Sequence, residues 1–207
     1  WKKGLHETPF LGYDEKEVTA IVKGIISGEG GKGEDNGQLL SHLHRPADTV
    51  VRLVLNHTPF YGESGGQVGD VGVISNDDFE FVVMDTQKHA ALIVHHGKLV
   101  RGEITEGAEC IAKVDMSHRG ALARAHSATH ILHHALHQNV GRHAEQQGSK
   151  VEADRLRFDF TNPKAIPDET LVQIEKDVLA LIDDKQPIRW NTVPLAEARE
   201  TGAMMLF

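Results

Sequence analysis

The segment AHSATHILHHALH, residues 125–137, carries five histidines in thirteen positions, and imidazole is a good ligand for zinc. On a helix, side chains four residues apart lie one above the other, so two such imidazoles can bind one ion. Three pairs have this spacing: His126 with His130, His130 with His134, and His133 with His137. Spacing does not choose among them, and for an arbitrary helix a histidine-rich face in contact with solvent is the more common arrangement.

One class of zinc enzyme is disfavoured by the same segment. Zinc peptidases of the His-Glu-x-x-His type place a glutamate directly after the first histidine, where it acts as the general base. Ser127 occupies that position here, and a hydroxyl cannot replace the carboxylate in that mechanism. The histidine segment therefore does not predict a peptidase.

Two further segments carry polar side chains that could line a pocket. The stretch HTPFYGESGGQVGDVG, residues 57–72, is a glycine-rich turn with Glu63, Ser64 and Gln67. Its backbone N–H groups could bind an anion or a carbonyl oxygen, although a plain hairpin loop has the same composition. The stretch QQGSKVEADRLRFDF, residues 146–160, indicates by itself an ordinary loop followed by a strand.

The elements around these segments fall into three parts. Apolar residues at helical spacing predict a helix over 14–28, and short β-type runs between 49 and 113 predict a small antiparallel sheet or barrel. A helix is expected from about Ser117 to Val140, and the alternation of RLRFDFT predicts a half-buried strand over 155–161.

The last forty residues predict further helices. An apolar stripe indicates an amphipathic helix over 168–185 that packs on another element, with Asp168 as its cap. The five residues of the stripe are Leu171, Ile174, Val178, Leu179 and Ile182. We expect a strand at PIRWNTV, a short helix begun by Pro194, and, from the apolar AMMLF, a natural polypeptide that continues.

Composition limits the classes of protein. No run approaches the roughly 18 apolar residues of a membrane span, so a membrane-embedded protein is not expected. A single cysteine, Cys110, cannot form an internal disulfide, which favours a cytoplasmic setting and a buried core position for Cys110. The net charge of −8 argues against nucleic-acid binding by the whole surface, but local basic clusters can still bind phosphates.

Taken together, four segments resemble a known family. TPFYGESGGQVGD is followed in order by HSATHILHHAL, GRHAEQQGSKVEADRLRFDF and GAMMLF, and this series resembles the editing region of alanyl-tRNA synthetase. The same region occurs in free-standing alanyl-tRNA editing proteins. The resemblance runs from about Thr58 to Phe207, and FLGYDEKEV is similar to the segment that leads into this region.

The resemblance implies a fold and a reaction. The fold is α+β, a small antiparallel β-barrel followed by an α/β editing domain of the threonyl/alanyl-tRNA synthetase type. We expect a helical and loop lead-in over 1–48, the barrel over 49–113 and the editing domain over 114–207. The reaction is hydrolysis of tRNA(Ala) mischarged with serine or glycine.

The resemblance also implies the site residues. Zinc would be bound by His126 and His130, which leaves His133, His134 and His137 as part of a solvated face. Two more ligands come, in the family, from a Cys-x-x-x-His motif beyond GAMMLF that this sequence does not include, so we expect a half-built zinc site. Thr129 and Gln146 would line the amino-acid pocket, bordered by Glu63, Gln67 and the loop 62–66.

The expected partners are the acceptor stem of tRNA(Ala) and the rest of the synthetase. The basic residues that would contact the acceptor-stem phosphates are Arg119, Arg124, Lys150 and Arg155. Two alternatives remain at this point, a free-standing editing protein and a non-catalytic module that binds tRNA. The segment 1–48 resembles the connection in the synthetase and favours a synthetase fragment.

Overall fold

A computed structural model describes residues 4–28, 37–44, 50–189 and 191–201. The chain divides into two compact units, one made of residues 1–124 with 150–155 and the other of residues 125–149 with 156–207. The expected apolar end, AMMLF, lies outside the described residues. Each unit has its own buried core.

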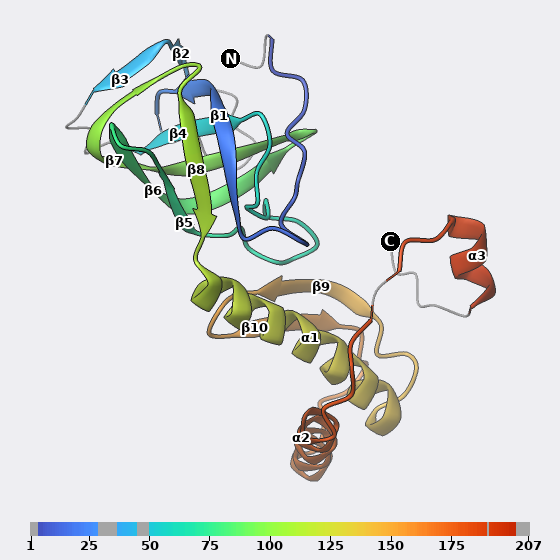
Figure 1. Cartoon of the computed structure of the whole chain (residues 1–207). Helices are drawn as coiled ribbons and strands as arrows, with labels where there is room; N and C mark the ends of the chain where they lie inside the picture. The colour runs from blue at the N-terminus through green and yellow to red at the C-terminus, as the bar shows by residue number, and fades with distance from the viewer. Residues whose placement is uncertain (1–3, 29–36, 45–49, 190, 202–207) are drawn as a thin grey trace. The chain divides into compact units, whose positions relative to one another are not determined.

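Antiparallel strands of the first unit close into a six-stranded barrel (Figure 1). The ring runs β1, β4, β7, β6, β5, β8 and back to β1, while β2 pairs with β1 and β3 with β7. The strands are β1 (Glu17–Ile26), β2 (Leu39–Leu40), β3 (His42–His44), β4 (Val51–Leu55), β5 (Gly72–Ser75), β6 (Phe79–His89), β7 (Leu92–Thr105) and β8 (Glu109–Val114). The antiparallel barrel expected from the sequence is confirmed, and its sheet begins at Glu17, upstream of residue 49.

The helix expected over 14–28 is wrong, because this segment is strand β1. Its apolar residues are mostly β-branched, and such side chains favour a strand. A register shift between Val22 and Gly24 changes the in-out alternation, so that Ile25 and Ile26 are both buried. That shift gives a strand the apolar spacing of a helix.

The barrel core is filled from all six strands of the ring. Phe60, which precedes β5 in the chain, and Phe81 on β6 are fully buried in it. Cys110 is also buried there, as expected, and its thiol lies 3.4 Å from the carbonyl oxygen of Ala20. Burial raises the pKa of Cys110 to about 12, so the thiol is protonated and inert.

Helix α1 (Met116–Asn139) follows β8 directly and contributes residues to both units. The carboxylate of Asp115 caps it by accepting hydrogen bonds from the backbone N–H groups of Ser117 at 2.8 Å and His118 at 3.1 Å. Gly141, with φ of 128°, follows its last turn. The helix expected over 117–140 is therefore confirmed, with bounds that differ by one residue.

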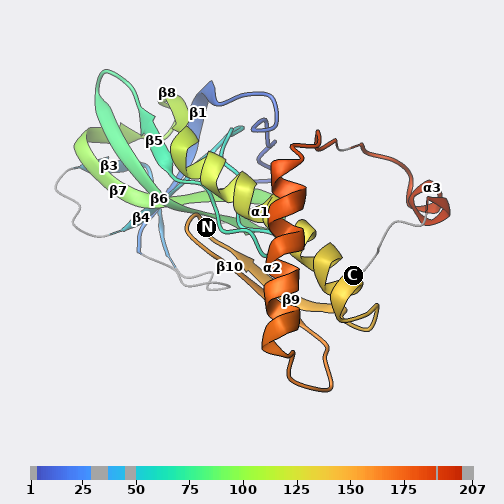
Figure 2. The same cartoon turned by 90° about the horizontal axis from the view of Figure 1, so that it is seen from below.

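The second unit contains β10 (Leu156–Phe160), α2 (Asp168–Asp183), α3 (Leu195–Glu200) and most of β9 (Gln146–Val151), whose last two residues are counted with the first unit. Strands β9 and β10 pair as a two-stranded sheet. Its core joins α1, α2 and β10 (Figure 2). The buried members are Ala135, Leu136, Ala144 and Ile174. Strand β9 corrects the expectation of a loop at residues 146–151, because pairing with β10 orders a segment with little apolar periodicity of its own.

The end of the second unit differs in detail from expectation. No strand forms at the described residues of 187–193, where Ile188 is exposed and meets no partner strand. Helix α2 is present, but Pro167 rather than Asp168 is at its N-cap. Of its apolar stripe, Ile174 is buried and Val178 partly buried, whereas Leu171, Leu179 and Ile182 are exposed. Among the described residues, none of the helices is both long and apolar enough to span a membrane.

Candidate functional site

His126 and His130 lie on the same side of α1. Their rings stack with centroids 5.3 Å apart and an angle of 22° between the planes. Burial, and secondly the neighbouring ring of His130, lowers the pKa of His126 below its ordinary value. A neutral imidazole keeps the nitrogen lone pair that a metal needs, so the pair has the chemistry of two adjacent zinc ligands.

The two imidazoles alone do not make up a complete zinc site. A structural or catalytic zinc takes three or four protein ligands in a tetrahedral arrangement. Within the described residues, no third histidine, cysteine or carboxylate atom gathers with this pair at the separation that one ion requires. The donor set therefore fits zinc as a partial site, and further ligands are needed to hold the ion firmly.

Thr129 and Gln146 belong to the same unit as the histidine pair. Thr129 falls between His126 and His130 in the sequence, and its side chain is buried. Its hydroxyl donates a hydrogen bond of 2.9 Å to the carbonyl oxygen of Ala125. Gln146 is half-buried at the start of β9, where its side-chain N–H donates to Ser149 Oγ at 3.1 Å. Both side chains are fixed by these bonds, and each keeps an oxygen that can accept a hydrogen bond.

The other histidines of α1 do not form a uniform solvated face, which corrects that expectation. His134 is exposed, but His133 is 3% exposed and donates through Nε2 to the carbonyl oxygen of Ala144 at 3.1 Å. Its ring also packs at 5.0 Å from that of Phe158. Burial lowers the pKa of His133, so this histidine is a neutral core residue.

Glu63 and Gln67 belong to the first unit, in the glycine-rich loop. Ser64 and Gln67 exchange backbone hydrogen bonds of 3.2 and 3.0 Å around Gly65 and Gly66, whose φ values are 59° and 81°. Two successive positive φ values explain the glycines, since other residues rarely adopt them. The carboxylate of Glu63 accepts a bond of 2.8 Å from the Gln87 side chain, which orients it beside β6.

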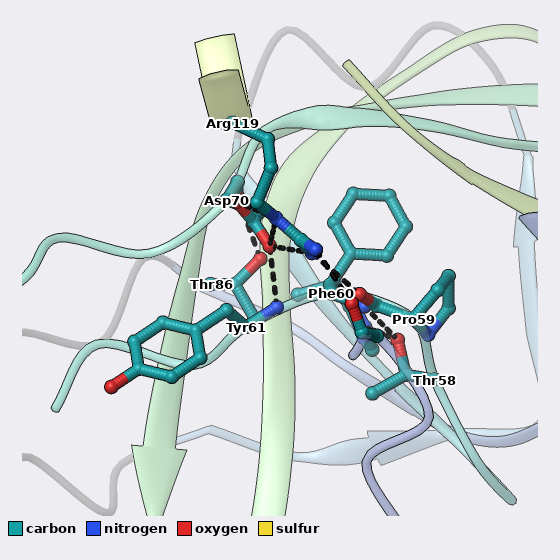
Figure 3. A network of polar contacts seen from close by, with 9 residues as sticks. Thr58, Pro59, Phe60, Tyr61, Asp70, Thr86 and Arg119 are labelled. Carbon is teal, nitrogen blue, oxygen red and sulfur yellow. Dashed lines mark hydrogen bonds and ion pairs between the residues drawn. The ribbon is translucent and has the colours of Figure 1, made fainter. Parts of the chain in front are cut away.

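Arg119 is engaged inside the first unit rather than presented to a phosphate (Figure 3). Its guanidinium pairs with the carboxylate of Asp70, which is fully buried, and donates to the carbonyl oxygens of Gly12 at 2.8 Å and Pro59 at 2.7 Å. The same carboxylate accepts the backbone N–H of Tyr61 at 2.6 Å. The motif TPFYGESGGQVGD thus anchors the first turn of α1, which accounts for Arg119 without RNA.

The other three basic residues are exposed. Arg124 faces solvent on α1, and Lys150 and Arg155 both bind the carboxylate of Glu152, at 2.7 and 2.5 Å. Hydrogen bonds from Arg155 and then Lys150 lower the pKa of Glu152 to about 2, so this group is an anion at neutral pH. Asp154, also exposed, is a second carboxylate that acts on Arg155, so two cations and two anions lie together on this surface.

Two polar arrangements were not expected from the sequence. One is the buried pair of Thr58 and His95, joined by a bond of 2.8 Å. The other is an exposed cluster of His42, His44 and Glu103 on β3 and β7. The signal for the second is His-x-His, since side chains two apart in a strand share a face, but this requires that the segment be recognised as a strand.

Comparison with known proteins finds relatives that are all aminoacyl-tRNA synthetases. Residues 2–118 match the family described as tRNA synthetases class II (A). An alanine–tRNA ligase of Rhodopirellula baltica is 73% identical over the whole chain, and those of Chromohalobacter salexigens and Gluconobacter oxydans are 43% and 42% identical over 97% and 96% of it. The chain spans 22% of the length of each of these relatives.

Proposed function

The chain belongs to the class II alanyl-tRNA synthetase family, and from this premise we propose that it is the proofreading segment of such an enzyme. Its reaction would be hydrolysis of the ester in Ser-tRNA(Ala) and Gly-tRNA(Ala). Water adds to the aminoacyl carbonyl carbon, and the bond from that carbon to the ribose oxygen breaks, so free amino acid and tRNA are released. The observation that carries this proposal is the stacked pair of His126 and His130, with the buried Thr129 on the same helix.

We assign two of the zinc ligands to His126 and His130. The remaining ligands would come from the Cys-x-x-x-His motif that the resemblance places beyond the 207 residues. A bound zinc ion would supply Lewis-acid polarisation at the ester. The chain's own part is to hold both imidazoles on one side of α1, and partial burial lowers the pKa of His126, which favours the neutral ring there.

Selection of serine is assigned to Thr129 and Gln146. A hydroxyl and an amide can each bind a seryl side chain, and a pocket built for a hydroxyl strongly disfavours substrates that lack it. The bonds from Thr129 to Ala125 and from Gln146 to Ser149 support this role, because they fix the two side chains before substrate arrives.

Contacts to the acceptor stem are assigned to Arg124, Lys150 and Arg155. All three are exposed. Lys150 and Arg155 both hydrogen-bond to Glu152, and Asp154 is a further carboxylate that acts on Arg155. Each phosphate contact adds affinity that weakens as salt is raised. Arg119 is left out of this set, since its guanidinium is committed to Asp70 and two backbone carbonyls.

A second candidate is a module that binds tRNA without hydrolysing the ester. It is favoured by the presence of only two zinc ligands around His126 among the described residues. Both candidates place the acceptor stem against the same exposed cations. They differ in whether the histidine pair is completed and used.

Hydrolysis of Ser-tRNA(Ala) tests the proposal. The 207-residue chain and a chain extended through the Cys-x-x-x-His motif are each assayed with and without added zinc. We expect the extended chain to release serine, and its H126A/H130A variant to lose this activity while H134A, an exposed histidine of the same helix, retains it. An extended, folded chain that binds tRNA but releases no serine would support the second candidate and overturn the first.

A further inference from the structure

We propose that His42, His44 and Glu103 form a second metal site, which binds a divalent transition ion of the zinc class on the barrel. All three residues are in the first unit, on β3 and β7. The proposal does not rest on the editing activity, and it concerns residues that the proposed function does not use.

The strand register brings the three residues together. His42 and His44 are two apart on β3, so their side chains leave the same face of the strand. On the antiparallel neighbour β7, His44 is opposite Glu103 and His42 is opposite Thr105. Directly opposed side chains are close enough to interact, so the pairing fixes the cluster through the backbone.

Three specific atoms converge on one point. Nε2 of His42 lies 3.2 Å from Nδ1 of His44 and 3.4 Å from Oε2 of Glu103, and Nδ1 of His44 lies 2.7 Å from the same oxygen. Ligand bonds of about 2.0–2.1 Å in a tetrahedron put neighbouring donor atoms roughly 3.3 Å apart. Two sides of the triangle already have that length, and the third requires only a small opening.

The ring of His42 is also held by its other nitrogen. Nδ1 of His42 lies 2.9 Å from the hydroxyl oxygen of Thr105, which can accept the N–H at that position. Metal-binding histidines usually donate their second ring nitrogen in this way, and such a bond fixes both the tautomer and the orientation. Thr105 is therefore a positioning residue that leaves Nε2 of His42 as the donor atom for the ion.

The donor set selects the class of ion. Two imidazole nitrogens and one carboxylate oxygen suit zinc and its neighbours, whereas magnesium and calcium prefer oxygen ligands throughout. The side chains of His42, His44 and Glu103 are 31%, 71% and 55% exposed, so water can complete the coordination. An ion bound here would link the three-residue strand β3 to β7, its partner in the sheet.

Zinc titration of the H126A/H130A chain, which lacks the histidine pair of α1, tests the site. In the H126A/H130A chain, we expect calorimetry to find one equivalent of zinc, and the added change H42A/H44A to abolish it. E103Q should weaken that binding by about tenfold or more, and T105V should weaken it less. H134A/H143A removes two other exposed histidines and is expected to change nothing at this site.

A second readout separates binding from folding. Zinc should slow hydrogen exchange of the β3 amides in the wild-type chain and in the H126A/H130A chain, but not in H42A/H44A. If H126A/H130A does not fold, the comparison is made on the wild-type chain, where H42A/H44A should bind one equivalent fewer. Zinc binding that H42A/H44A leaves unchanged overturns the site, whatever the result of the serine-release assay.

Discussion

Asp70 and Arg119 lie 49 residues apart in the chain and form an ion pair in which the carboxylate is fully buried and the arginine side chain is 16% exposed. The pair joins the end of the glycine-rich motif to the first turn of α1 (Figure 3). Because Gly12 and Pro59 also accept from the guanidinium, one side chain ties three segments of the first unit together. Arg119 thus organises the base of α1.

Replacing Arg119 should destabilise the chain strongly. R119M leaves the Asp70 carboxylate buried without its cation, and breaking a buried pair in this way costs about 3–5 kcal/mol. The measurement is the free energy of unfolding from urea denaturation at neutral pH. R124M, at an exposed position of the same helix, should change it by less than about 0.5 kcal/mol. Equal stabilities for R119M and R124M would refute the structural role.

Thr129 should affect serine release more than glycine release. T129V keeps the shape but removes the hydroxyl, so kcat/KM for Ser-tRNA(Ala) should fall by about a hundredfold if the hydroxyl binds the seryl side chain. Gly-tRNA(Ala) has no side-chain hydroxyl, and its hydrolysis in the extended chain should fall much less. T129S should restore serine release. A parallel loss for both substrates would mean that Thr129 acts on the scaffold instead.

His95 should make the barrel less stable as the pH falls. The buried ring donates through Nδ1 to the carbonyl oxygen of Leu53 and accepts from Thr58, so it is neutral. Burial lowers the pKa of His95 to about 4, against 6.5 for the ordinary group. Between these values the unfolded chain takes up a proton and the folded chain does not, so stability is lost as pH drops from about 6.5 to 4.

The loss assigned to His95 is at most about 3 kcal/mol, from the separation of the two pKa values. It is measured by urea denaturation at a series of pH values. H95Q should be less stable at pH 7 yet show a flatter dependence on pH, whereas H134Q should keep the wild-type slope. An unchanged slope in H95Q would assign the pH dependence to other groups.

Lys150 and Arg155 should set the salt dependence of tRNA binding. K150A and R155A should each weaken binding and lower the slope of log affinity against log salt by about one. E152Q should strengthen binding, because it removes the carboxylate that competes for both cations. K113A is the control, since Lys113 is also exposed and also paired, with Glu17 at 3.2 Å. An equal effect of K113A would indicate a nonspecific loss of charge.

Most strands can be predicted from the sequence, but not those whose conformation depends on pairing with another strand. The strands between 49 and 113 were recognisable because each alternates or is rich in β-branched residues between turn signals. Strand β1 has the apolar spacing of a helix, three and four residues apart, because its register shift interrupts the alternation of a strand. Strand β9 has hardly any apolar pattern, and its conformation depends on β10, which no local signal reveals.

In the candidate site, too, features set by local spacing can be predicted, whereas contacts between distant segments cannot. The stacking of His126 and His130 follows from their separation of four residues on a helix, which can be read from the sequence alone. The commitment of Arg119 to Asp70 and the meeting of β3 with β7 depend on contacts between segments about fifty or more residues apart. Charge and residue type alone therefore assigned Arg119 to RNA and gave no reason to group His44 with Glu103.

Strand β1 has a consequence for synthesis of the protein. Its first half, Glu17–Ile21, pairs with Lys113 to Glu109 of β8, while its second half pairs with β4. On the ribosome, the earliest strand must therefore wait until the last one has left the exit tunnel before the ring can close. During that interval the unpaired edge of β1 is open to wrong partners, so this part of the nascent chain is exposed to aggregation until residue 114 emerges.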